Sequence, residues 1–106
     1  MQRRMNRDFL RQARQLQERL AQVQEEIENT TVEASAGGGA VTVIMTGKPK
    51  VHSIVIAPEV IDPNDPEMLQ DLVAAAVNEA LERAQALQAQ KLGSVAPGGM
   101  GLPGLP

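Results

Sequence analysis

The 106-residue sequence contains no cysteine, tryptophan or tyrosine, and Phe9 is its only aromatic residue. The absence of cysteine excludes disulfides and thiolate metal sites. The scarcity of aromatic side chains leaves Val, Ile, Leu, Met and Ala to form the core, and a chain this short buries relatively little surface as a monomer. We therefore expect one small domain whose folding includes oligomerisation.

Long apolar runs are also missing. The N-terminal stretch MQRRMNRDFLRQAR is charged throughout and lacks the hydrophobic region of a signal peptide. No segment approaches the roughly 20 apolar residues that a membrane-spanning helix needs. These absences predict a soluble cytoplasmic protein without a membrane partner.

The formal net charge of -3 conceals an uneven distribution. Residues 1–20 carry six arginines against Asp8 and Glu18, whereas the rest of the chain carries four basic and eleven acidic residues. Screening limits each charge to a reach of about 8 to 10 Å at physiological salt, so the local excess matters more than the total. The N-terminal region is therefore suited to an anionic partner.

Residues 6–29 are predicted to form the first helix, because apolar residues recur there at spacings of three and four. Such a helix would be about 36 Å long, so one end must project from a three-stranded sheet or pair with another chain. Its arginines crowd the N-terminal half, where they oppose the helix dipole, which indicates that they serve something outside the helix. The apolar seam consists of Met5, Phe9, Ala13, Leu16, Leu20, Val23 and Ile27.

Three strands are predicted next, at residues 31–36, 40–46 and 51–56, because apolar and polar residues alternate there. The segments GGG and TGKPK would connect them as turns, which gives an antiparallel meander. In the middle strand the alternation places Val41, Val43 and Met45 on one face. In the last strand it places Val51, Ser53 and Val55 opposite His52, Ile54 and Ile56.

A second helix is predicted to begin after Asp65, a good N-cap, and to fade between Lys91 and Gly93. Its apolar stripe is rich in alanine. Residues 93–106, GSVAPGGMGLPGLP, have no usable period and are expected to form a flexible tail behind a domain of residues 1–92. The predicted fold class is α+β, with the order α-β-β-β-α.

No pattern in the chain indicates catalysis, a cofactor or a metal. The glycines at 37–39 precede a strand, without the helix N-terminus and GK[ST] signature of a phosphate loop, so a hairpin turn explains them. His52 is the only histidine, and its neighbours on a strand point to the other face. The acidic residues of 62–67 lack the glycine and distal glutamate of a calcium loop and are explained by helix capping. We therefore expect a protein that is not an enzyme.

The arginine-rich helix leaves two interpretations open. Its charges can bind the phosphates of a nucleic acid through bidentate arginine contacts. Alternatively, the charges can keep the helix soluble while it serves as a scaffold for other proteins. The residues alone do not separate these alternatives.

Several stretches, in their residues and in their order along the chain, resemble the YbaB/EbfC family of bacterial nucleoid-associated proteins. The resemblance rests on GGGAVTVIMTGKPKVHSIVI, on LVAAAVNEAL and on the final GGMGLPGL, and it covers roughly residues 5–105. Many members begin near the equivalent of Met5, so residues 1–4 are a possible N-terminal extension.

The resemblance implies a homodimer that closes through its sheets, with projecting helices that bind DNA in the cytoplasmic nucleoid. It implies a role in nucleoid organisation or gene regulation, and duplex DNA is favoured because no aromatic platform exists for stacking single strands. The alternative is a helical interaction module that acts with replication or recombination proteins. The candidate DNA-binding residues are Arg3, Arg4, Arg7, Arg11 and Arg14 of the first helix, and Arg83 and Lys91 of the second.

Overall fold

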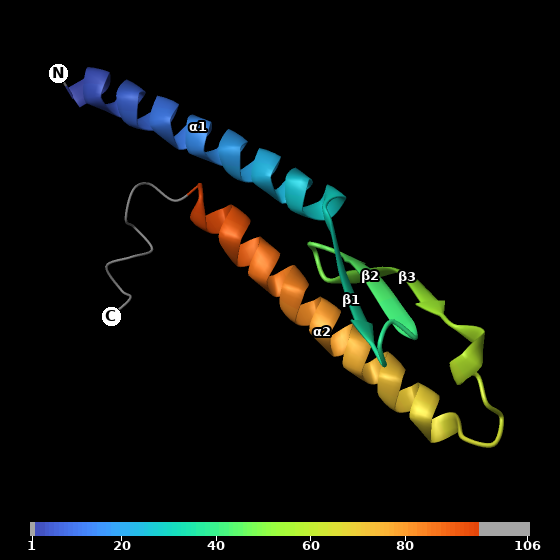
Figure 1. Ribbon diagram of the computed structural model, residues 1–106. Coiled ribbons are helices and arrows are strands. Elements are labelled where there is room, and N and C mark those ends of the chain that lie inside the picture. The colour runs from blue at the N-terminus through green and yellow to red at the C-terminus, as the bar shows by residue number, and fades with distance from the viewer. Residues whose placement is uncertain (1, 96–106) are drawn as a thin grey trace, which may run out of the picture.

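The computed structural model describes the backbone of residues 2–95 and the side chains of residues 6–95. It confirms the α-β-β-β-α order (Figure 1). The first helix begins earlier than its predicted start at Asn6, because the preceding Gln, Arg, Arg and Met are good helix formers. Residues 96–106 of the predicted tail lie outside the described residues. The elements are α1 (Gln2–Asn29), β1 (Thr31–Ala36), β2 (Val41–Thr46), β3 (Lys50–Ile56), the short 3-10 helix η1 (Pro58–Val60) and α2 (Pro66–Gly93).

The three strands form one antiparallel sheet in the order β1-β2-β3. Val43 at its centre pairs with Ala34 on one side and Ile54 on the other. The connection between β1 and β2 uses Gly37, Gly38 and Gly39, whose φ angles are 65°, 66° and 93°. Only glycine adopts such positive angles without steric cost, so the predicted role of these glycines as a turn is confirmed.

α2 covers the face of the sheet that carries Val41 and Val43, and it lies over β1 and β2 (Figure 1). Both valines are fully buried, as are Ala76, Ala80 and Ala84 of the helix. Alanine at these positions lets the helix backbone approach the sheet closely. The core is therefore thin and consists mainly of small side chains.

The predicted alternation of β3 is wrong at its beginning. Ile44 pairs with Ser53 but the next residue, Met45, pairs with Val51, so the register shifts and His52 has no partner of its own. This β-bulge places Val51 on the same face of the sheet as Met45 and Ile54, which is the face that α2 covers. A strict period of two cannot reveal an inserted residue.

The molecule is strongly elongated, with extents of 77 × 30 × 16 Å and a radius of gyration of 20.6 Å. A compact chain of this length would have a radius of gyration of about 13 Å. α1 accounts for much of the difference, because only its C-terminal part contacts α2 and β2 while its N-terminal part projects (Figure 1). The root of α1 is fixed where the amide of Gly47 donates to the carbonyl of Thr30 at 2.8 Å.

Candidate nucleic-acid interface

The projecting part of α1, residues 6–19, is here called the α1 arm. Arg7, Arg11 and Arg14 of this arm are all exposed. Their spacing of four and three residues places them within about 60° of arc on one side of a helix with 3.6 residues per turn. We call these three side chains the arginine face.

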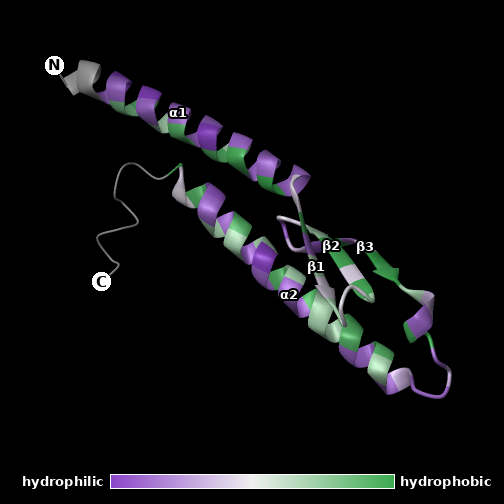
Figure 2. Cartoon of the chain, viewed as in Figure 1, coloured by the Kyte–Doolittle hydropathy of each residue, from purple (hydrophilic) through white to green (hydrophobic). Residues whose placement is uncertain are grey.

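The opposite side of α1 carries the apolar seam, whose described members are Phe9, Ala13, Leu16, Leu20, Val23 and Ile27. Burial increases along the seam, because the exposed fraction falls from 70% at Phe9 through 39% at Leu16 to 4% at Ile27. Figure 2 shows the apolar positions of α1 along the side that is turned toward α2. The seam therefore orients the helix and leaves the arginine face turned away from the domain.

The arginine face makes no ion pair with any carboxylate among the described side chains. The ion pairs that the described side chains form involve the basic residues Lys48, Arg83 and Lys91 instead. Three guanidinium groups are thus presented to solvent with no carboxylate of the described side chains within ion-pair distance. Because a guanidinium matches phosphate oxygens through paired N–H donors, this surface is suited to a phosphate backbone.

Arg83 lies in the middle of α2, remote in sequence from the arginine face. It forms an ion pair with Glu79 at 3.0 Å, and its Nη1 donates to the backbone carbonyl of Glu33 on the edge strand β1. The side chain therefore ties α2 to β1. Sequence patterns did not reveal this contact, because the two partners lie 50 residues apart.

Lys91 lies in the last turn of α2, where its Nζ is 3.7 Å from the carboxylate of Glu26 in α1. Glu26 is about 18 Å along the helix from Arg14, at 1.5 Å per residue. The structure thus brings together Arg7, Arg11 and Arg14, and it places Arg83 and Lys91 outside that group. The side chains of Arg3 and Arg4 lie outside the described set, although their backbone continues α1.

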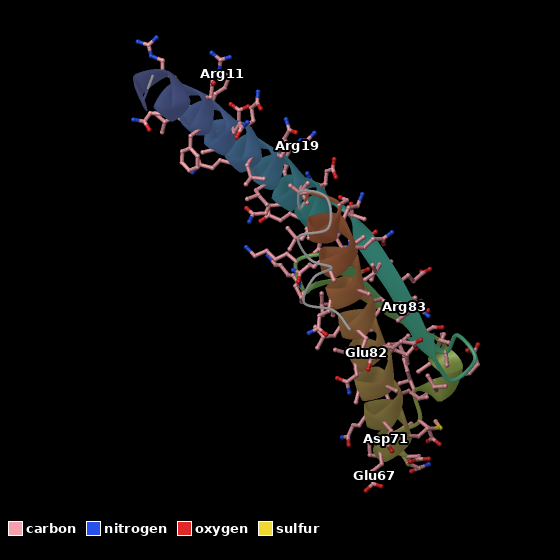
Figure 3. All side chains as sticks on the ribbon, turned by 90° about the vertical axis from the view of Figure 1, so that its left-hand side faces the viewer. Arg11, Arg19, Glu67, Asp71, Glu82 and Arg83 are labelled. Atoms are coloured by element: carbon pink, nitrogen blue, oxygen red, sulfur yellow. The ribbon has the colours of Figure 1, made fainter. Side chains whose placement is uncertain are left out.

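Charge is separated along the length of the molecule. Figure 3 shows Arg11 and Arg19 on α1 near one end, and Glu67 and Asp71 at the start of α2 near the other. A polyanion that approaches this chain is repelled by the acidic end and attracted by the α1 arm.

A shallow pocket of about 330 Å³ lies at the root of α1, between Gln24, Lys48 and Gln88. Within the described range, no three His, Cys, Asp or Glu side chains are grouped so that they could hold a metal ion. Neither long helix, over the residues that the structure describes, has an apolar stretch sufficient to cross a membrane.

A family model described as the YbaB/EbfC DNA-binding family matches residues 1–100. The chain belongs to this family. The match includes the glycine turn, the sheet, both helices and the arginine face, so it spans every element described above. The resemblance suggested by the sequence is confirmed.

Several relatives that are similar to this chain are named nucleoid-associated proteins. One from Acetivibrio thermocellus is 50% identical over 98 residues, which covers 92% of this chain and 87% of the relative. One from Streptomyces avermitilis is 52% identical over 100 residues, with coverages of 92% and 88%. One from Roseiflexus is 51% identical over 98 residues, with coverages of 92% and 96%.

The crystal structure of an uncharacterized protein from Helicobacter pylori has a similar fold. It superimposes with a TM-score of 0.69, covers 77% of this chain and 86% of its own, and shares 18% sequence identity. At this identity the likeness supports the α-β-β-β-α architecture of the YbaB/EbfC chain and no more.

Proposed function

We propose that this YbaB/EbfC chain is a non-enzymatic, cytoplasmic DNA-binding protein of the nucleoid that contacts duplex DNA mainly through phosphates. The observation that carries the proposal is the arginine face, three exposed arginines without an intramolecular anion among the described side chains. The family description and the names of the relatives support DNA and the nucleoid as its setting. Nucleoid organisation and gene regulation are the roles that such binding would serve.

The contacts are assigned by how freely each side chain can reach a phosphate. Arg7, Arg11 and Arg14 are the principal candidates, and Arg3 and Arg4 extend the same helix toward its N-terminus. The candidates on α2 are minor contributors, because each is already engaged with a carboxylate of its own chain.

We further propose that the protein acts as a homodimer that closes through its sheets. β3 supports this, because Val51 is 42%, Ile54 41% and Val55 59% exposed, on both faces of an edge strand. Covering these side chains would add apolar burial to a core that is otherwise thin. Light scattering at micromolar concentration tests the dimer, and a monomeric mass would refute it.

Salt dependence is the direct test of phosphate contacts. A dimer that neutralises about 6 to 8 phosphates should show a slope of roughly -5 to -7 when the logarithm of the binding constant is plotted against the logarithm of the salt concentration. Fluorescence anisotropy with a labelled duplex across a salt series measures this slope. Absence of binding at low salt would overturn the proposed function.

Substitutions can locate the contact surface while the total charge is controlled. The double variant Arg7→Gln/Arg11→Gln should make the slope less negative by about 4 for a dimer, because four phosphate contacts are lost. The double variant Lys48→Gln/Lys50→Gln removes the same charge from the exposed β2–β3 turn and the first residue of β3, and should leave most of the slope intact. Equal losses in the two variants would show that net charge, and not the arginine face, determines binding.

A helical interaction module that acts with replication or recombination proteins is the alternative. The exposed apolar residues Phe9, Leu10 and Leu16 of the α1 arm favour it. The triple variant Arg7→Gln/Arg11→Gln/Arg14→Gln separates the two, because it should abolish DNA binding and leave recovery of a protein partner unchanged. Loss of partner recovery together with DNA binding would count against a separate protein-binding role.

A further inference from the structure

α2 covers the apolar seam of α1 only in part. Ile27 is buried, whereas Leu16 is 39% and Phe9 70% exposed, so the cover ends between the root and the tip of the arm. The ion pair of Lys91 with Glu26 places the last turn of α2 against the last turns of α1. The uncovered seam is therefore continuous with an interface that already exists within the chain.

α2 ends beside the last turns of α1, and the described part of the chain ends two residues after it. Ser94 caps the helix with its hydroxyl donating to the carbonyl of Lys91 at 2.7 Å, and the amide of Val95 donates to the carbonyl of Leu92 at 3.2 Å. Val95 is only 7% exposed, so the described part of the chain ends at a buried residue. Residues 96–106 follow directly from that buried position.

We propose that residues 96–106 dock on the exposed part of the apolar seam of the same chain, along Leu16 and Phe9. This segment, APGGMGLPGLP, has no charged side chain and has three large apolar side chains, Met100, Leu102 and Leu105. Its proline nitrogens have no N–H group, so fewer backbone donors lose water on an apolar surface. Docking needs no helix or strand in the segment, so its glycine and proline content is no obstacle.

The segment is long enough to reach the tip of the arm. Eleven extended residues span at most about 36 Å, whereas the distance along α1 from Glu26, beside which α2 ends, to Phe9 is about 26 Å. The tether keeps the segment at an effective concentration on the order of millimolar near the seam. The arginine face points the other way, so the docked segment leaves it accessible.

A second α1 helix fits the exposed seam less well. Only the outer half of the seam is uncovered, because α2 already occupies the region around Ile27. The tail, which follows from Val95, needs only the uncovered part of the seam.

The absence of cysteine in the native sequence makes the test clean. A nitroxide attached to Gly104→Cys in the full-length, nitrogen-15-labelled protein should broaden the amide signals of residues 9–16. Signals from the open face of the sheet, such as those of Thr42 and Ser53, should stay sharp. No selective broadening of the arm would overturn the proposal.

Two controls distinguish docking from mere proximity and from contact between chains. The variant Met100→Ser/Leu102→Ser/Leu105→Ser, with the same label and length, should lose most of the broadening, and Ala96→Ser should keep it. Broadening that survives the triple change would overturn the proposal, because tethering alone would explain it. In a mixture of spin-labelled chains and separately isotope-labelled chains the arm should stay sharp. Broadening there would assign the seam to a second copy and overturn docking within the chain.

Discussion

Substitution of Gly47 by alanine should destabilise the protein by loosening the root of α1. A Cβ atom at this position would lie 2.5 Å from the carbonyl oxygen of Ile27, 2.8 Å from Cδ2 of Leu87 and 2.9 Å from Cγ2 of Ile27. The Leu87 methyl can move, but the carbonyl oxygen belongs to the last turns of α1 and can yield only if the helix shifts. The new methyl group therefore pushes α1 away from both β2 and α2.

The expected cost is that of adding a methyl group to a filled site, about 1 to 3 kcal/mol. For a domain of this size, roughly 4 to 8 °C of melting temperature are lost per kcal/mol, so the midpoint should fall by about 10 °C. Thermal unfolding followed by far-UV circular dichroism measures this. All variants must be compared at one protein concentration, because an oligomer's apparent stability depends on it.

Gly93→Ala is the matched control for the same chemical change. Gly93 is the last residue of α2, and an added Cβ atom there would have no neighbour within 4 Å. Its melting temperature should equal or slightly exceed that of the native protein, because alanine favours helix. The steric argument fails if Gly47→Ala melts within about 2 °C of Gly93→Ala.

Three further outcomes follow from other contacts. Asp65→Ala should cost about 1 kcal/mol in the free energy of unfolding measured with urea, because the Asp65 carboxylate caps the first turn of α2; an unchanged midpoint would contradict this role. Gly37→Ala should destabilise more than Gly38→Ala, since both have positive φ but only a side chain at 37 would meet Leu72, at 2.8 Å; equal melting temperatures would show that only the backbone angle matters. Arg83→Gln should lower stability by roughly 1 kcal/mol, the scale of one exposed pair and its hydrogen bond, and change DNA affinity less than twofold; a large loss of affinity in anisotropy titrations would make it a principal contact.

The sequence predicted much of the fold because local patterns determine it. The alternation through Val41, Val43 and Met45 identified the buried face of β2, and the bounds of β1 agree with the prediction. The capping role of Asp65 followed from residue type alone. The pairing register of β3 could not be predicted, because the alternation of residues in the sequence does not reveal the extra residue of a bulge.

The arrangement of the candidate site was predictable only in part. Arg7 and Arg11 share a face because of helical spacing, which the sequence shows directly. The engagement of Arg83 with a carbonyl of β1 depends on a long-range approach of α2 to the sheet. The close packing around Gly47 likewise arises from three elements that meet only in the folded chain. Such contacts leave no local signal.

α1 is long and is held at its C-terminal end by contacts with Gly47, so a small rotation there moves its N-terminal end a large distance. From Ile27 to Arg7 the helix measures about 30 Å, so a tilt of about 10° around Gly47 displaces the arginine end by about 5 Å. Duplex DNA carries one phosphate charge per roughly 1.7 Å of its axis, so that displacement equals about three charges. In the proposed complex, a single hydrogen-bonded glycine would set the phosphates that each arm reaches. In the proposed dimer, small changes in packing around Gly47 would therefore alter the distance between the two arms without a change in any arginine.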